Sequence, residues 1–448
     1  MNLFFDSALK RLFLTGIKPL QLIINTEITH YKKLSSESRR MLLSIFLFSL
    51  ALPLMSVFIN TFLWRELHSV GIIVLYNFSN FIGVPAGFYL NGFLLKKYPT
   101  KNIYFGGAIA QGVIVALLLF FSLTESVSVT IAGICLGIVA GIYWANRTLL
   151  LTHITKNHQR IYFVSLEQIL VTLTGIIAPF FIGWFIVSGE HFIAGWSKNA
   201  YQFLALFFVI LLFFSGKVMY QSEINIPRLK EFSPFKPSKR WQNVRSMMFF
   251  SGMLHGVELV LPILVVMILL GNEKTLGTIM AVTGIFVSLA LYKIARTVGQ
   301  KYRFRTLCLS VFLSILGASL FNYYYSVIGV ICYFILNSFA TTIRGTIIGP
   351  LSLEVITGEE FRQARHRYLY IADRELFVNI GRNTSLSVFF LLHLLSPDFA
   401  LRATPLIFAL TMIAGIWFMS LIEKELVAED ILTSAPIFNY VRSFYNRD

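Results

Sequence analysis

The residues of this sequence that are best suited to chemistry are charged side chains inside long apolar stretches. Arg147 lies in one such stretch, and Glu167 follows it near the start of the next. Arg344 repeats this layout in the second half of the chain, where Asp373 and Glu375 follow it. A charge within a membrane span costs roughly 2.5–3.5 kcal/mol on insertion scales and tends to mark a pathway or a paired network. The repetition predicts a transporter built from two related bundles.

The two arginines allow more than one interpretation. At 1.5 Å per residue, Arg147 and Glu167 both lie roughly 8–10 Å from the expected cytoplasmic edge, so an ion pair between them is expected. In the first interpretation such pairs form a network that holds the cytoplasmic side closed, with Glu354 as another possible partner of Arg344. In the second, Arg147 or Arg344 binds an anionic substrate. Packing, or snorkelling of the charge towards the interface, is the third.

A carboxylate near the middle of a later span is the candidate for proton coupling. Glu258 lies centrally in the expected span 247–270, and His255 lies three positions earlier, on the same helical face. An isolated carboxylate at this depth must be protonated or paired, because an uncompensated charge is costly there. We therefore expect Glu258 to exchange a proton, with His255 tuning it. A hydrogen bond between helices and a direct substrate contact are the alternatives.

Polar and aromatic side chains near these charges are candidates for the lining of a cavity. Arg382 lies between Asn379 and Asn383, and this polar stripe favours hydrogen bonds between helices over substrate contact. The cavity-lining candidates are Tyr143, Trp144, Asn146, Asn77 and Arg382.

The elements that position these residues are apolar helices. The 448-residue chain is 56% hydrophobic and 13% charged, whereas soluble domains are about 25% charged. Apolar runs long enough to span a bilayer recur along it, which indicates a polytopic membrane protein. We expect twelve spans, at 41–64, 69–94, 103–123, 128–152, 161–187, 200–216, 247–270, 275–292, 306–324, 326–350, 368–395 and 403–422.

The distribution of the basic residues predicts the orientation in the membrane. The formal charge is +16, and 30 of the 38 Lys and Arg residues fall on one side of the expected spans, whereas four fall on the other side. By the positive-inside rule this places both termini in the cytoplasm of a bacterial plasma membrane. The basic excess then contacts anionic lipid, which argues against nucleic acid as a partner.

The chain divides into two halves at a basic segment. Residues 217–246 contain three prolines and seven Lys or Arg residues and follow six expected spans. Pro53 and Pro262 occupy matching places in similar ten-residue strings of the first and seventh spans. The expected organisation is a cytoplasmic amphipathic segment at 1–40, which lies on the membrane or packs on the bundle, a bundle at 41–216, a linker at 217–246, a bundle at 247–422 and a tail at 423–448.

Six plus six spans with a long basic central loop resemble the major facilitator superfamily. Its signature after the second span is written G-x3-D-(R/K)-x-G-(R/K)-(R/K), and Gly87 and the lysines Lys96 and Lys97 fit it. Asn91 replaces the aspartate and Leu94 replaces the second glycine. The second-half copy near 296–301 is also degraded. The resemblance implies two pseudo-symmetric six-helix bundles, all α, that rock about a midplane site and work as a monomer.

Together these features predict a secondary active transporter of a small solute by alternating access, with a coupled proton. The apolar, aromatic-rich spans favour an exported amphipathic compound, whereas the two arginines favour an anion. The alternatives are an uncoupled facilitator of an anionic solute and a membrane receptor that has lost transport. The sequence contains no P-loop, no metal-ligand spacing and no nucleophile–base arrangement, so neither an enzyme nor a cofactor is expected.

Overall fold

The structure is a computed structural model that describes residues 31–121, 125–154, 157–193, 195–224, 226, 228–229, 232, 236–297, 303–363 and 367–434. Its main elements are twelve helical rods. The first rod is continuous through α2 (Ser36–Pro53), the π-helical turn η1 (Leu54–Phe58) and α3 (Ile59–Leu67). A single turn, η2 (Gly189–His191), precedes α8. The other rods are α4 (Val70–Lys97), α5 (Thr100–Phe120), α6 (Ser126–Ile154), α7 (Asn157–Ser188), α8 (Trp196–Tyr220), α9 (Lys239–Leu269), α10 (Glu273–Thr297), α11 (Arg303–Tyr323), α12 (Val327–Gln363), α13 (Arg367–Leu395) and α14 (Pro397–Ser434).

Each of the twelve expected spans coincides with one rod, although five of them extend one to three residues past an end of it. The expected all-α, twelve-helix architecture is confirmed. Within the described residues, ten rods are long and apolar enough to cross a membrane by length and composition. The remaining two rods are α10 and α13. α13 carries five charges in its first sixteen residues, Arg367, Asp373, Arg374, Glu375 and Arg382. The chain is an integral multi-pass membrane protein.

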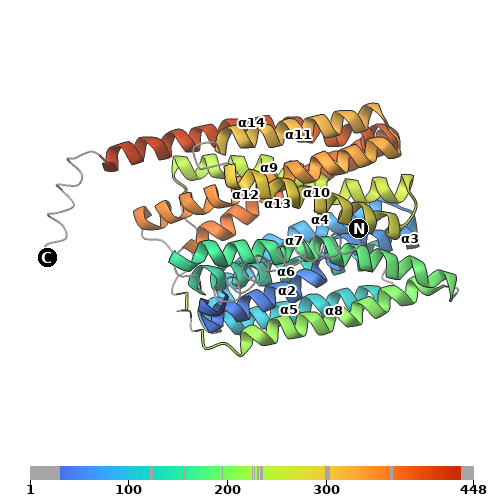
Figure 1. The fold of residues 1–448 in the computed structure, drawn as a ribbon, viewed down its shortest axis with the longest axis horizontal. Helices are drawn as coiled ribbons and strands as arrows, with labels where there is room; N and C mark the ends of the chain where they lie inside the picture. The colour runs from blue at the N-terminus through green and yellow to red at the C-terminus, as the bar shows by residue number, and fades with distance from the viewer. Residues whose placement is uncertain are drawn as a thin grey trace, which may run out of the picture.

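The rods alternate in direction, so their ends form two faces (Figure 1). We call the outer end the face that carries the connections at 67–70, 188–196, 269–273 and 395–397, and the inner end the opposite face. The outer end, where α3 finishes, lies on the right of Figure 1, and α14 finishes on the left. The sequence predicts that the inner end is cytoplasmic.

The rods pack as two groups. In the first group α4 packs on α6, α5 packs on α6 and α8, and α2 packs on α7 and α8. In the second group α9 packs on α13 and α14, and α11 packs on α12 and α14. The groups meet chiefly where α7 packs on α10 and α4 packs on α13. In Figure 1 the blue-to-green first group lies below the yellow-to-red second group.

The connection between the groups is shorter than the expected 217–246 linker. α8 continues to Tyr220 and α9 begins at Lys239, because helices extend past the apolar core of a span. Parts of this connection lie outside the described residues. The same holds for residues 1–30 of the expected N-terminal segment, for residues 435–448 of the expected tail and for 298–302, where the second signature copy falls.

Glycines allow close packing of helix backbones within each group. A Cβ atom at Gly137 of α6 would collide with the carbonyl oxygen of Asn80 on α4, and one at Gly381 of α13 would collide with that of Phe249 on α9. Small residues let helix backbones approach closely in a membrane, where packing rather than the hydrophobic effect drives helix association. α6, which carries Arg147, is therefore packed closely on α4, and α13, which carries Arg382, is packed closely on α9.

Candidate functional site

Two adjoining cavities lie in the middle of the molecule. Cavity A has a volume of about 410 Å³ and is lined mainly by α2 and η1, α4, α6 and α13. Cavity B has a volume of about 450 Å³ and is lined mainly by α7, α9, α10 and α12. Ser56, in the π-helical turn, and Leu259 line both cavities. The two compartments together are large enough for a small organic molecule, for which pockets of about 300–1,000 Å³ are usual.

Arg147 and Glu167 meet as the sequence indicates. The Arg147 guanidinium, from α6, donates to Glu167 Oε1 on α7, and each side chain is 15% exposed. The same guanidinium lies 4.9 Å from the centre of the Trp144 ring. Both helices belong to the first group, so the pair holds together one bundle. Its role as a gate between bundles stays a prediction.

The partner of Arg344 differs from the expected ones. Arg344 on α12 binds Glu258 on α9, with Nη2 donating to Oε1 at 2.6 Å, and the side chains are 4% and 3% exposed. The expectation of Asp373, Glu375 or Glu354 was wrong because α12 runs on to Gln363. Arg344 therefore lies near the middle of its helix, level with Glu258, and not close to the inner end.

The three carboxylates that the sequence analysis proposed as partners of Arg344 are each paired with another arginine. Asp373 accepts hydrogen bonds from Arg245 Nε at 2.7 Å and from Trp241 Nε1 at 2.6 Å, both on α9. Glu375 pairs with the adjacent Arg374, whose Nη2 donates at 2.7 Å. Glu354 pairs with Arg303 of α11 at 2.7 Å, near the inner end. The charges of the second half thus form separate pairs and not the expected network around Arg344. The pair of Arg374 and Glu375 lines cavity A.

His255 hydrogen-bonds Arg382 and not Glu258. The distance between His255 Nδ1 and Arg382 Nη2 is 2.9 Å. A guanidinium only donates, so Nδ1 must accept and the proton of the neutral ring lies on Nε2. His255 lines cavity B and Arg382 lines cavity A, so their contact lies between the two compartments. The expected direct tuning of Glu258 by His255 is not supported by this hydrogen bond.

Three of the five cavity-lining candidates, Asn77, Trp144 and Arg382, line cavity A. The other two do not. Tyr143 is fully buried, stacks on Phe48 with ring centres 4.0 Å apart and hydrogen-bonds Tyr104. Asn146 is fully buried and donates to Asn91 Oδ1 at 2.6 Å. Positions 144 and 147 share one face of α6, whereas 143 and 146 share another, so neighbouring residues serve different contacts.

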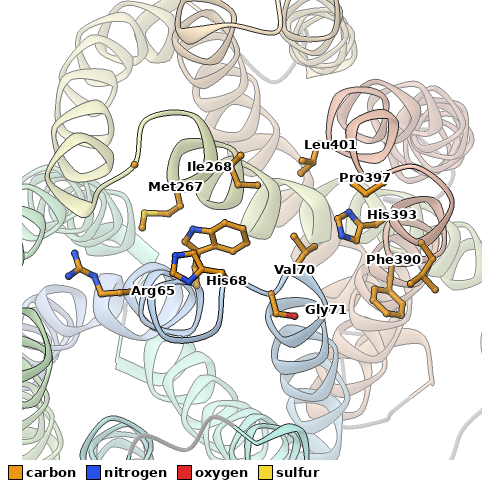
Figure 2. A pocket seen from close by; sticks show the side chains of 14 residues that line it. Arg65, His68, Val70, Gly71, Met267, Ile268, Phe390, His393, Pro397 and Leu401 are labelled. Atoms are coloured by element: carbon orange, nitrogen blue, oxygen red, sulfur yellow. The ribbon is translucent and has the colours of Figure 1, made fainter.

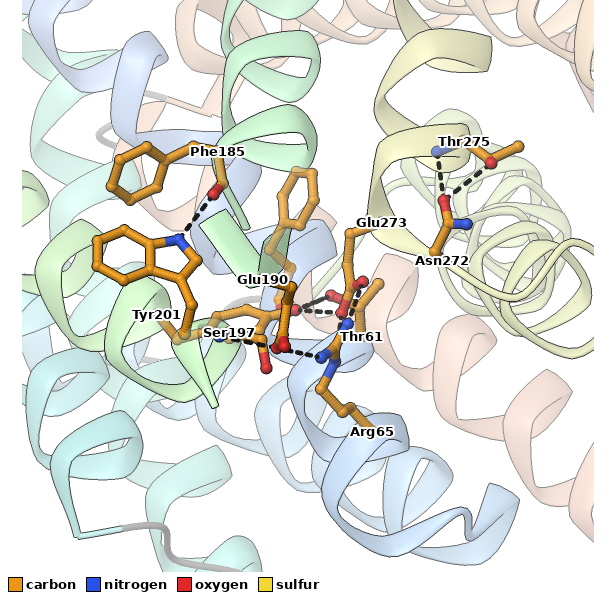
Figure 3. A network of polar contacts seen from close by, with 11 residues as sticks. Thr61, Arg65, Phe185, Glu190, Ser197, Tyr201, Asn272, Glu273 and Thr275 are labelled. Carbon is orange, nitrogen blue, oxygen red and sulfur yellow. Dashed lines mark hydrogen bonds and ion pairs between the residues drawn. The ribbon is translucent and has the colours of Figure 1, made fainter. Parts of the chain in front are cut away.

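A polar network at the outer end joins the two groups, and the sequence analysis missed it. Arg65 of α3 donates through Nε and Nη2 to the carboxylate of Glu273 on α10, at 3.0 and 2.8 Å (Figure 3). The Glu273 side chain is completely buried, and Tyr201 of α8 lies 3.1 Å from its Oε1. Arg65 and Glu273 carry opposite charges, and each lies next to the outer end of an expected span, one in each half of the chain. The sequence analysis only counted the basic residues on this side to predict the orientation, and it did not consider an ion pair there.

Glu190 completes this network. Its Oε1 lies 3.5 Å from Arg65 Nη1 and accepts a hydrogen bond of 3.0 Å from the backbone amide of Ser197. Hydrogen bonds from the side chain and the backbone of Ser197 hold the pKa of the Glu190 carboxyl below its usual value, with a smaller contribution from Arg65. The outer end therefore carries one guanidinium between two carboxylates (Figure 3).

At the inner end the groups meet through Asn91 and Tyr368. Asn91 of α4 donates to the hydroxyl of Tyr368 on α13 at 3.0 Å, and this hydroxyl donates to the carbonyl of Phe88 at 2.6 Å. Asn91 occupies the aspartate position of the degraded signature. The replacement places an uncharged side chain, fully buried, in a contact between the groups.

A further cavity opens at the outer end, where α3, α4, α9, α13 and α14 come together. It has a volume of about 990 Å³. Figure 2 shows His68 and His393 on opposite sides of it, with Val70 and Ile268 between them. His68 ends α3 in a left-handed conformation, with φ of 49°, so the chain turns sharply into α4. This cavity is larger than either of the central cavities.

Comparison with known proteins shows the family. The sequence model of the Major Facilitator Superfamily matches residues 41–357. An uncharacterised protein of Bacillus subtilis, YqgE, is 26% identical over 348 residues, which cover 77% of this chain and 80% of that protein. An uncharacterised protein of Geobacillus stearothermophilus, from the sodM 3′ region, is 25% identical over 36% of this chain and 72% of that one.

Solved structures share the fold at low sequence identity. The human organic anion transporter MFSD10 aligns with a TM-score of 0.58 at 11% identity, covering 86% of this chain and 99% of that one. The nucleoside transporter NupG aligns with a TM-score of 0.59 at 15% identity and the same two coverages. The Escherichia coli fucose:proton symporter FucP aligns with a TM-score of 0.58 at 14% identity, covering 85% and 97%. With its twelve helices in two groups around central cavities, this chain is a transporter that belongs to the Major Facilitator Superfamily.

Proposed function

We propose that this protein is a secondary active transporter that couples the movement of a small solute to a proton, and that Glu258 carries the proton. The observation that supports the proposal is the buried pair of Glu258 and Arg344. Glu258 also lines cavity B, so one side of the pair adjoins the space that a solute would occupy. A carboxylate that is both buried and next to the cavity is placed to exchange a proton when the cavity opens.

The coupling follows from the cost of an uncompensated charge. While Arg344 faces it, Glu258 can stay ionised. A solute or a helix shift that draws the guanidinium away would leave a lone carboxylate in an apolar interior, and such a group is neutralised by taking up a proton. Arg344 has alternative oxygens nearby, since Ser314 Oγ and Thr341 Oγ1 each lie 3.4 Å from a guanidinium nitrogen. The pair can therefore separate without leaving the guanidinium bare.

Alternating access would use the contacts between the two groups. The pair of Arg65 and Glu273 joins the two groups near the outer end, and the bond of Asn91 to Tyr368 joins them near the inner end. We propose that the two groups rock about the central cavities, so that one of these contacts breaks while the other persists. Each of these contacts lies near an end of the helices, where water can form hydrogen bonds with the separated partners. The centre of the membrane would supply no such water.

The test measures solute flux in proteoliposomes with an imposed pH gradient, using a solute identified by a transport screen. Glu258→Gln, and the double variant Glu258→Gln with Arg344→Gln, should lose gradient-driven accumulation and keep downhill exchange. Glu354→Gln is the matched control, because Glu354 is a half-exposed carboxylate paired with Arg303 at the inner end. Full accumulation by both Glu258 variants would refute the coupling and favour an uncoupled facilitator.

A further inference from the structure

Cavity A carries one positive charge without a matching carboxylate. Three arginines line it: Arg147, Arg374 and Arg382. Arg147 is paired with Glu167, and Arg374 is paired with Glu375. Arg382 has no carboxylate within ion-pair distance among the described residues, and Glu375, two helical turns earlier on α13, is already bound to Arg374.

The neighbours of Arg382 orient its guanidinium without neutralising it. Nη1 donates to Asn379 Oδ1 at 3.0 Å, and Nη2 donates to His255 Nδ1 at 2.9 Å. The guanidinium carbon lies 5.1 Å from the centre of the Phe81 ring. Nε is buried and has no hydrogen-bond partner. An amide, a neutral imidazole and an aromatic face stabilise a cation only partly, and a charge at this depth is retained where it serves a pathway or a ligand.

The rest of the lining indicates the body of the ligand. Cavity A is walled by apolar side chains, among them Leu52, Met55 and Leu136, and by the Trp144 ring. The amides of Asn77 and Gln111 add polar groups that carry no charge. A pocket of this kind holds an apolar body and uses few polar groups to fix its orientation. A second charge on the ligand would have no partner here, because the other two guanidiniums are engaged.

We infer that Arg382 is the anion-binding residue of the substrate site, and that the substrate is a singly charged organic anion, a carboxylate or sulfonate, with an apolar or aromatic body. The inference rests on the proposed transport function but not on its proton coupling. The sequence analysis considered Arg147 and Arg344 as anion-binding residues and favoured a helix–helix contact for Arg382. The anion is here assigned to Arg382 instead. The bound anion would supply the negative charge that pairs with the Arg382 guanidinium.

The test is a binding measurement on purified protein in nanodiscs. The probes are aromatic and alicyclic carboxylates and sulfonates, each compared with its neutral amide or sulfonamide of the same shape. Acids should raise the melting temperature of the wild type more than their amides do. Arg382→Gln should weaken binding of the acids by roughly tenfold or more, the loss expected for a charged hydrogen bond, and leave the amides unchanged. Arg382→Lys should recover part of the affinity.

The controls separate a charge effect from a folding effect. Arg402→Gln removes an arginine that lies over Tyr325 at the outer end and should bind the acids like the wild type. Glu354→Gln, which changes a carboxylate at the inner end that lines neither central cavity, should also bind them like the wild type. Because binding is measured without a pH gradient, failure of this inference is distinguishable from failure of the coupling proposal. If no acid exceeds its amide on the wild type, or if Arg382→Gln and Arg382→Lys bind the acids like the wild type, the inference is overturned.

Discussion

Glu258 on α9 and Arg344 on α12 form an ion pair in which both side chains are less than 5% exposed, although the residues are 86 positions apart in the chain. Each charge is tolerated because the other is present. The pair joins two helices of the second group beside cavity B. A change in the charge of either residue therefore changes the packing of α9 on α12 and, with it, the wall of cavity B.

The first prediction concerns the stability of this pair. Glu258→Gln alone leaves Arg344 buried and unpaired, and it should lower the free energy of unfolding by about 3–5 kcal/mol. Replacing both residues by Gln should cost much less than either single change, because no lone charge remains. Thermal unfolding of the four proteins in detergent, arranged as a double-mutant cycle, checks this. Additive losses would mean that the two side chains do not interact.

The second prediction concerns the outer end. Glu273→Gln removes the charge that holds Arg65, so the outer contact should open more often, by roughly tenfold if a charged hydrogen bond is lost. The measurement is the rate at which an impermeant maleimide labels Asn337→Cys, a buried residue lining cavity B, in a background with the three natural cysteines replaced by serine.

Two further variants control this experiment. Glu190→Gln should increase labelling less than Glu273→Gln does. Glu190 lies 3.5 Å from Arg65 and accepts a hydrogen bond from Ser197, and all three residues belong to the first group, so Glu190 does not join the two groups. Exchanging the two charges, Arg65→Glu with Glu273→Arg, should return labelling towards the wild-type rate. Equal labelling of the wild type and Glu273→Gln would show that the pair does not close the outer end.

The third prediction separates a structural pair from a gate. Arg147 and Glu167 belong to helices of the same group, so each single substitution by Gln should lower the free energy of unfolding by about 1–3 kcal/mol. The exchanged pair Arg147→Glu with Glu167→Arg should regain part of this. Maleimide labelling of Asn337→Cys should stay unchanged throughout. A large change in labelling would instead support the gating role that the sequence analysis assigned to this pair.

The fourth prediction concerns helix packing. Gly137→Ala places a methyl group against the Asn80 carbonyl of α4 and should cost about 1–3 kcal/mol through overpacking. Gly106→Ala is the matched control, because nothing lies within 4 Å of a Cβ atom built there. That change should be neutral or stabilise α5 by about 0.5–1 kcal/mol, as alanine is the better helix former. Thermal unfolding of both variants gives the sign, and equal effects would contradict the close approach.

The positions of the membrane helices were predictable from the sequence because they depend on local properties. A span needs about twenty apolar residues, and the distribution of Lys and Arg is visible in the printed chain. The division into two halves rests on the same information. The pairing of Arg147 with Glu167 was within reach too, because consecutive antiparallel helices place residues near their shared end at a common depth.

The partners of the remaining charges were decided only by the tertiary structure. The depth of Arg344 depends on where α12 ends, and the apolar pattern does not show that the helix continues to Gln363. The rotation of α6 decides that Trp144 faces cavity A while Tyr143 is buried against Phe48. Arg65 and Glu273 are 208 positions apart, and Arg382 and His255 are 127 apart. Hydropathy fixes which segments enter the membrane, whereas the packing of helix against helix fixes which faces meet, and with them which charge is left without a partner.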